Sequence, residues 1–112
     1  NVDVKLENGM VELIPARTEL LQNYPNPFNP ETWIPFRLAD DADVIIKIYD
    51  MTGKLVRKFD LGHVDSGNYI SRSRAVYWDG RNKQGERVAS GVYIYQLQVD
   101  GKAFVRKMVI LR

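Results

Sequence analysis

The chain has 112 residues, of which 45% are hydrophobic and 27% charged, and its formal net charge is +2. This length accommodates one globular domain, and so small a net charge does not indicate nucleic acid or an anionic membrane as the main partner. Without cysteine, the chain has no disulfides and no thiolate metal sites, and without a run of eighteen apolar residues it has no predicted membrane-spanning helix.

The first fourteen residues predict a β-hairpin. Apolar residues alternate on both sides of Asn8-Gly9, which is a favoured two-residue hairpin turn. The sequence begins with neither Met nor a leader-like segment, so it reads as part of a longer protein. We therefore expect residues 1–19 to be an N-terminal hairpin or linker from an upstream region, and residues 20–112 to form the domain.

A proline-rich segment follows the predicted hairpin. Four prolines interrupt residues 15–30 and exclude a regular helix or a central strand over most of this range. Residues 19–22 allow a single helical turn at most. We expect the segment to run extended along a sheet edge, with Tyr24 and Phe28 inserted into the body of the domain.

The rest of the chain alternates with the two-residue period of β-strands. Strands are predicted at residues 33–38, 44–49, 54–59, 70–78, 92–99 and 102–111. Residues 60–68 are predicted as a loop. Arg72 and Arg74 share a face with Val76 and Trp78, so we expect the strand 70–78 to project past the core at its start.

About seven short strands and frequent turn signals predict an all-β protein, an immunoglobulin-like antiparallel β-sandwich. A small closed barrel is the alternative. The prediction requires that Phe36, Ile46, Trp78 and Leu97 meet between two stacked sheets. A solid core of this kind leaves little cleft for a substrate, so we predict that the protein is not an enzyme.

Candidate catalytic residues are few. His63 is the one histidine and lies in a Gly-containing stretch, where an isolated side chain is usually solvated. A Ser-His-Asp system would use it with Ser66 or Ser71 as the nucleophile. No G-x-S-x-G motif is present, so we do not expect a triad.

Carboxylates in the predicted turns raise the question of a metal site. Asp40, Asp41 and Asp43 offer oxygen ligands for a weak Ca²⁺ site, which is the one cofactor that the sequence leaves open. The run DGRNKQGE is different, because Arg81 and Lys83 occupy positions where a Ca²⁺ loop needs acidic or amide ligands. We interpret that run as a β-turn.

Two other surfaces are weaker candidates. Trp33 and Tyr49, if both face outward, would form a platform for carbohydrate, although such residues are more often core or inter-domain contacts. The basic run at residues 71–74 is short and lacks interleaved aromatic residues, so we predict no nucleic-acid partner.

Several motifs together resemble a known family. The run YPNPFNPETWIPFRL and the runs IKIYDMTGKLVR and WDGRNKQGERVASGVYIYQL are similar to the C-terminal sorting domain of type IX secretion substrates. The last two runs also resemble the immunoglobulin-like domain of the flagellar hook-capping protein. The residues that carry this structural signature are Tyr24, Pro25, Phe28, Trp78, Gly80, Gly91 and Tyr93.

The resemblance implies a function in protein targeting rather than in catalysis. A sorting domain directs an upstream passenger through an outer-membrane secretion translocon, and a surface-processing protease typically removes it. The implied location is secreted or at the cell surface, peripheral to the bacterial outer membrane. The alternative is a structural, carbohydrate-binding or Ca²⁺-binding immunoglobulin-like accessory module of a secreted multidomain protein.

The final strand is the predicted recognition surface for the translocon. Its basic residues are Lys102, Arg106, Lys107 and Arg112. If that strand lies at a sheet edge, its free backbone groups can accept a strand from a partner. The alternative is that these charges only keep an edge strand soluble and unpaired.

Overall fold

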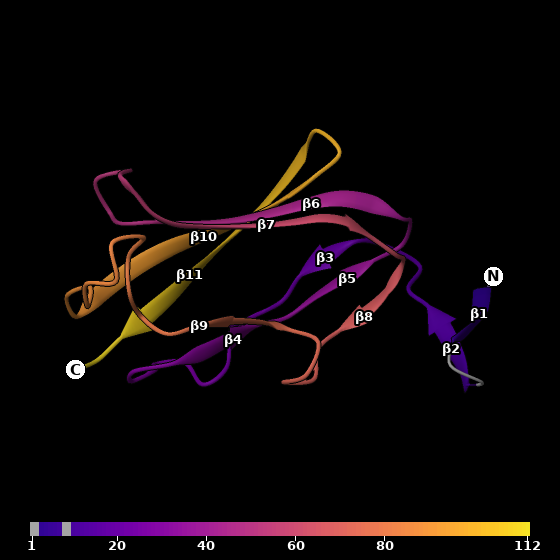
Figure 1. Cartoon of the computed structure of the whole chain (residues 1–112), viewed down its shortest axis with the longest axis horizontal. Helices are drawn as coiled ribbons and strands as arrows, with labels where there is room; N and C mark the ends of the chain where they lie inside the picture. Colours follow the sequence, from indigo (N-terminus) through magenta and orange to yellow (C-terminus); the bar gives the residue numbers. More distant parts are fainter. Residues whose placement is uncertain (1–2, 8–9) are drawn as a thin grey trace.

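Strands with alternating buried and exposed side chains build two stacked antiparallel layers (Figure 1). The computed structural model describes residues 3–7 and 10–112. One layer has the strand order β11-β10-β6-β7, formed by β6 (Ala42–Tyr49), β7 (Leu55–Val64), β10 (Gly91–Val99) and β11 (Lys102–Ile110). None of the described residues belongs to a helix that could cross a membrane.

The second layer consists of shorter strands. It contains β3 (Glu19–Leu20), β4 (Thr32–Ile34), β5 (Phe36–Leu38), β8 (Gly67–Tyr69) and β9 (Val76–Trp78). The strands β3, β5 and β8 form one sheet, and β4 pairs with β9. The predicted immunoglobulin-like antiparallel sandwich is confirmed.

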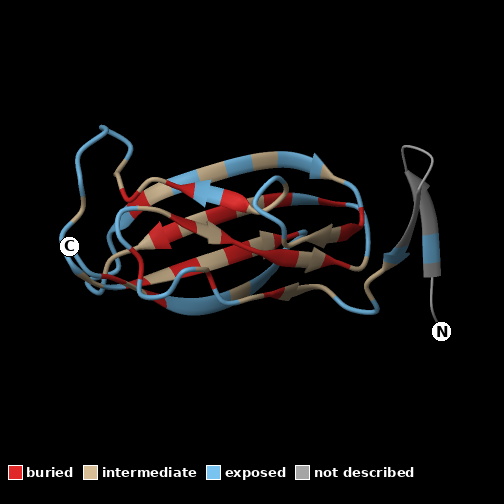
Figure 2. Cartoon of the chain, turned by 90° about the horizontal axis from the view of Figure 1, so that it is seen from below, coloured by how far each residue is buried: buried red, intermediate tan, exposed pale blue. Residues whose placement is uncertain are grey.

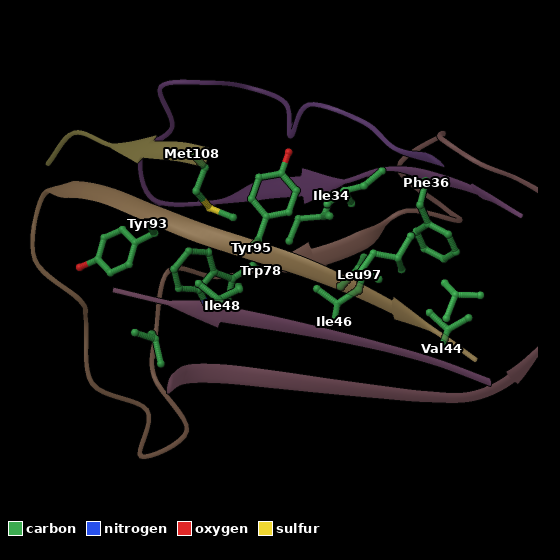
Figure 3. Close-up of a cluster of buried hydrophobic side chains, with 14 of the residues drawn as sticks. Ile34, Phe36, Val44, Ile46, Ile48, Trp78, Tyr93, Tyr95, Leu97 and Met108 are labelled. Atoms are coloured by element: carbon green, nitrogen blue, oxygen red, sulfur yellow. The ribbon is translucent and has the colours of Figure 1, made fainter. Parts of the chain in front are cut away.

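The hydrophobic core fills the space between the layers (Figures 2 and 3). Phe36, Ile46, Trp78 and Leu97 are each at most 1% exposed and belong to one cluster, as predicted. Antiparallel pairing places Leu97 opposite Ile46. Because alternate residues point to opposite faces of a strand, this register directs one face of β6 and β10 into the core.

Pro35 divides the predicted strand 33–38 into two. Ile34 ends β4 opposite Val76, whereas Phe36 begins β5 opposite Tyr69. Proline has no N–H to donate to a ladder, but its carbonyl still accepts the N–H of Leu21 at 3.1 Å. The chain therefore changes pairing partners at Pro35 without leaving the layer.

Two sequence-based assignments differ from the structure here. The predicted loop at residues 60–68 contains the end of β7, which bends at a bulge where Gly62 adopts a φ of 68°, and the start of β8. The single helical turn allowed at residues 19–22 is instead the two-residue strand β3. A short strand is possible there because Leu20 pairs with Phe36 and packs into the core.

The predicted strand 70–78 is strand only from Val76 onward. The N–H groups of Arg74 and Ala75 both donate to the carbonyl of Ser71, at 2.9 and 2.7 Å, and form a turn. This turn keeps the two arginines out of the core. The Arg72 guanidinium lies 4.3 Å from the ring centre of Trp33, so the strand does not project as predicted.

The N-terminal hairpin consists of β1 (Asp3–Glu7) and β2 (Met10–Ile14), which pair in antiparallel register. Its strands agree with the prediction, and the Asn8-Gly9 turn lies outside the described residues. The side-chain amide of Asn68 donates to the carbonyl of Leu13 at 3.2 Å, which joins the hairpin to the body. The domain division at residues 19 and 20 stays a prediction.

Candidate recognition site on the last strand

The strand β11 lies at an edge of the four-stranded sheet, as the recognition hypothesis requires. Toward this edge, the Val109 N–H donates to Asn26 Oδ1 at 3.0 Å and the Val109 carbonyl accepts the Phe28 N–H at 2.9 Å. Outward and inward hydrogen bonding alternate along an antiparallel strand, so the backbone groups of Ala103 and Val105 also point outward. Among the described residues, none donates to or accepts from those groups. The open part of the edge is therefore residues 103–105.

The other half of the β11 edge is covered by the proline-rich segment. Leu111 donates its N–H to the Phe28 carbonyl at 3.0 Å, and Gln22 Nε2 donates to the Lys107 carbonyl at 2.9 Å. The predicted extended path along an edge is confirmed. An edge shielded in this way cannot pair with a partner strand over its full length.

A buried polar network fixes the proline-rich segment to the core. The Tyr95 hydroxyl accepts the Asn23 N–H at 2.9 Å and donates to the Leu21 carbonyl at 2.7 Å. The Asn23 side chain donates to Thr32 Oγ1 at 3.0 Å. Burial raises the pKa of Tyr95 to about 12, so its hydroxyl stays protonated and available to donate.

Sequence reasoning missed this network. Asn23 and Thr32 are 2% and 0% exposed, although both residue types usually lie at the surface. The signal that could have found them is the inward position of Tyr95 in its strand, because a buried tyrosine hydroxyl needs a polar partner.

The four predicted recognition cations differ in their surroundings. Arg106 Nε donates to the Leu20 carbonyl at 2.7 Å. Arg112 donates from Nε to the Val88 carbonyl at 2.7 Å and from Nη2 to the Gly80 carbonyl at 2.8 Å. The side chains of Lys102 and Lys107 are exposed and form no hydrogen bond or ion pair with other described residues. The two lysines are thus the cations available to a partner, and Arg112 holds a loop.

The aromatic signature residues have structural positions. Phe28 is 1% exposed, and its ring centre lies 5.5 Å from that of Trp78. Trp78 Nε1 donates to the Arg81 carbonyl at 2.8 Å, and the Tyr93 hydroxyl donates to the Ala89 carbonyl at 2.7 Å. These side chains join the proline-rich segment, the loop after β9 and β10 into one body.

The remaining signature residues shape the backbone. Gly80 has a φ of +74°, and a Cβ built there would lie 2.6 Å from the Pro30 carbonyl oxygen. The Pro25 carbonyl accepts hydrogen bonds from Asn23 and Thr32. Gly91 begins β10, and the Tyr24 hydroxyl donates to the Ile70 carbonyl. The predicted insertion of Phe28 is confirmed, whereas Tyr24 is only half-buried.

The three carboxylates of the acidic turn have different neighbours. Asp40 lines a cavity of about 420 Å³ together with Lys102, and Asp43 contacts His63 Nδ1 at 3.3 Å. Asp41 instead lies near His63 and Asp65, with ligand atoms within 4.8 Å of one another. All three of these residues are exposed, and Asp41 accepts the Ser66 N–H at 2.8 Å. Asp40 and Asp43 do not belong to this group, and the weak Ca²⁺ site at Asp40, Asp41 and Asp43 stays a prediction.

The other weak candidates have the following surroundings. His63 is exposed and contacts Asp43, while Ser66 is 8% exposed and its N–H is bound by Asp41. Trp33 and Tyr49 lie on β4 and β6, which belong to different layers, so the predicted two-residue sugar platform is wrong. Trp33 instead packs against Tyr24 and Tyr77, with ring centres 6.3 and 5.4 Å away.

Comparison with known proteins gives a family match over most of the chain. The family model described as the FlgD Ig-like domain matches residues 27–103. No curated protein sequence is significantly similar to the chain.

Solved structures share the fold. Dimeric latent PorU from Porphyromonas gingivalis superposes with a TM-score of 0.60 and 25% identity, over 84% of this chain and 9% of that chain. PorZ from the same organism is described as an essential bacterial surface component of the type-IX secretion system. It superposes with a TM-score of 0.54 and 27% identity, over 81% of this chain and 11% of that chain. FlgD from P. aeruginosa superposes with a TM-score of 0.56 and 19% identity, over 86% of this chain and 67% of that chain. This similarity shows the fold alone. The chain thus spans about a tenth of the PorU and PorZ chains.

Proposed function

The chain belongs to the FlgD Ig-like domain family, and from this premise we propose that it is a non-catalytic sorting and anchoring module of a type IX-like secretion route. In this proposal the chain is the C-terminal targeting domain of an upstream passenger protein. The similarity to a segment of PorZ supports this assignment, because PorZ is a surface component of that system. The two sequence signatures described above support it as well.

The observation that carries the proposal is the open edge of β11 at residues 103–105 beside the free cations Lys102 and Lys107. An exposed edge presents backbone donors and acceptors to which an extended partner strand can add. Two lysines without partners among the described residues favour a partner segment that carries carboxylates. The partner is the secretion translocon or the surface-processing protease, and the location is secreted or at the cell surface, peripheral to the outer membrane.

A rigid domain is suited to a sorting signal that the secretion machinery recognises after the domain has folded. The core residues Ile34, Ile46, Tyr95 and Leu97 are completely buried, and interiors packed in this way resist local opening and proteolysis. The recognition strand is attached to that body through β10 along its whole length. The edge is thereby presented in one fixed geometry.

The experiment fuses the full chain, residues 1–112, to the C-terminus of a secreted reporter. The fusion is expressed in a type IX-competent host and in a matched host without the translocon. We expect extracellular reporter only in the competent host, and a severalfold decrease for the variant Lys102→Gln/Lys107→Gln. The variant Lys54→Gln/Lys83→Gln changes the charge equally at another site and should export normally. Periplasmic retention of the unmodified fusion in the competent host would contradict the proposal.

A second candidate is a structural or ligand-binding accessory module. The observation that favours it is the aromatic cluster of Tyr24, Trp33 and Tyr77, in which Tyr77 is 45% exposed. Exposed aromatic rings stack on the apolar faces of sugars. Saccharide titration monitored by tryptophan fluorescence, with Trp33→Ala as the comparison, tests this candidate independently of export.

A further inference from the structure

The outer face of the four-stranded sheet has an unusual composition. Residues that alternate with the buried side chains of β6, β10 and β11 point away from the core. We call this surface the lysine face, and we define it as the solvent-facing side of β6, β7, β10 and β11 around Lys47, Lys58, Ile94, Val105 and Lys107. The recognition hypothesis uses only Lys107 and the backbone edge at Val105 from this surface.

Apolar side chains occupy much of the lysine face. Val92 and Leu55 are 37% and 41% exposed, and Val105 is 58% exposed. The register makes this surface continuous, because Ile94 lies between Tyr49 on β6 and Lys107 on β11. The solvent side of an antiparallel sheet is normally polar. The exposed apolar side chains of this face are therefore unusual for a surface that contacts only water.

Lysines supply the positive charge on this face. Lys47 and Lys58 lie directly opposite each other on β6 and β7, and like charges in that position destabilise a sheet. Among the described residues, none forms an ion pair with these two lysines or with Lys107.

Two carboxylates, Asp43 and Asp60, lie on the same side, and neither forms an ion pair with these lysines among the described residues. Asp60 accepts the Gly62 N–H at 3.1 Å, and Asp43 contacts His63. Three unpaired lysines on a partly apolar surface therefore favour an anionic, partly apolar counterpart outside the chain.

We propose that the lysine face binds the surface of an anionic lipid bilayer. Strands are about 4.8 Å apart, so the lysines on β7, β6 and β11 spread over three strand spacings, roughly 14 Å. Such a spread matches a plane of separate anionic headgroups better than it matches a single anion. Lysine stems lie along apolar surface while the ammonium groups reach the headgroups.

A protein partner is the less favoured occupant. The centres of protein interfaces are enriched in aromatic residues, methionine and arginine and are depleted in lysine. The lysine face combines lysines with aliphatic side chains and one tyrosine, Tyr49, and neither of its directly opposed cations, Lys47 and Lys58, is an arginine. The proposal is independent of the export function, because it concerns a purified domain and a lipid surface.

The test is cosedimentation of the full chain with vesicles at 0.1 M salt. Phosphatidylcholine/phosphatidylglycerol vesicles (3:1) are compared with pure phosphatidylcholine. One lysine near an anionic surface contributes about 1 kcal/mol, so Lys47→Gln/Lys58→Gln should weaken binding to the anionic vesicles about 30-fold. Val105→Ser removes apolar contact and should weaken it severalfold.

The matched control is Lys54→Gln/Lys83→Gln, which removes the same charge away from the lysine face and should change binding less than threefold. Circular dichroism and thermal melting establish that each variant is folded. The proposal is overturned if the unmodified chain does not bind anionic vesicles, if it binds neutral vesicles equally well, or if the control variant loses as much affinity as Lys47→Gln/Lys58→Gln.

Discussion

The hydroxyl of Tyr95 accepts the backbone N–H of Asn23 at 2.9 Å, across 72 positions of the sequence. This contact joins a central strand of one layer to the segment that shields the edge of β11. The same hydroxyl donates to the Leu21 carbonyl, so one core side chain anchors two residues of an irregular segment. The position of the recognition edge therefore depends on a buried polar contact as well as on apolar packing.

Tyr95→Phe should destabilise the domain. The substitution keeps the ring but leaves the Asn23 N–H and the Leu21 carbonyl without their partner in a region excluded from water. An unsatisfied buried polar group costs about 1–3 kcal/mol of unfolding free energy. Urea denaturation measures the loss, with Tyr49→Phe on the solvent side of β6 as the control, which should change stability by less than about 0.5 kcal/mol.

The stability of the domain should fall at alkaline pH because of the same residue. Burial raises the pKa of Tyr95 from 10.0 to about 12. Above pH 10 the unfolded state releases the phenol proton while the folded state retains it, so the folded state binds more protons and stability decreases as pH rises. The stabilisation is complete below pH 10 and is lost as the pH rises from 10 to 12.

The measurement compares unfolding free energies at pH 9 and pH 11.5 for the unmodified chain and Tyr95→Phe. The unmodified chain should lose about 2 kcal/mol more than the variant over this interval. Equal losses would mean that Tyr95 does not retain its proton in the folded state.

The regular strands could be predicted from the sequence because their environment is simple. The segments 44–49 and 92–99 alternate cleanly, and each has one face in the core and one in solvent. For such strands the hydrophobic period alone determines which side chains are buried. The predicted inward faces of Ile46 and Leu97 are accordingly confirmed.

The boundaries that failed depend on tertiary contacts. The turn at Ser71 follows a strand that ends at Tyr69, and Arg72 gains a cation–aromatic contact with Trp33, 39 positions earlier in the chain. No local pattern encodes that contact. The lysine face could not be predicted for a related reason. The net charge of +2 is a sum over the whole chain and does not indicate that three lysines lie on one surface.

Gly80→Ala should be much more destabilising than Gly85→Ala. Both glycines have positive φ angles, +74° and +83°, so both substitutions strain the backbone by about 1–2 kcal/mol. Only at Gly80 does a Cβ meet the Pro30 carbonyl, at 2.6 Å, whereas nothing lies within 4 Å at Gly85. Thermal melting should show a clearly lower Tm for Gly80→Ala, and similar melting temperatures would contradict the close approach.

Arg112→Ala should loosen the loop that follows β9. The guanidinium donates to the carbonyls of Val88 and Gly80, and the Val88 N–H in turn donates to the Gly80 carbonyl at 3.1 Å. Removing the arginine should lower stability by about 1–2 kcal/mol, the range for charged hydrogen bonds at a partly exposed site. Hydrogen exchange of the Val88 amide should become faster.

Lys107→Ala is the comparison for this loop, because Lys107 is a cation on the preceding strand, β11, whose side chain forms no hydrogen bond with other described residues. Its removal should leave both the stability and the Val88 exchange rate unchanged. If Lys107→Ala reduces reporter export while preserving stability, and Arg112→Ala reduces both together, then the lysine acts in recognition and the arginine acts in folding. Unchanged Val88 exchange in Arg112→Ala would show that the arginine does not hold the loop.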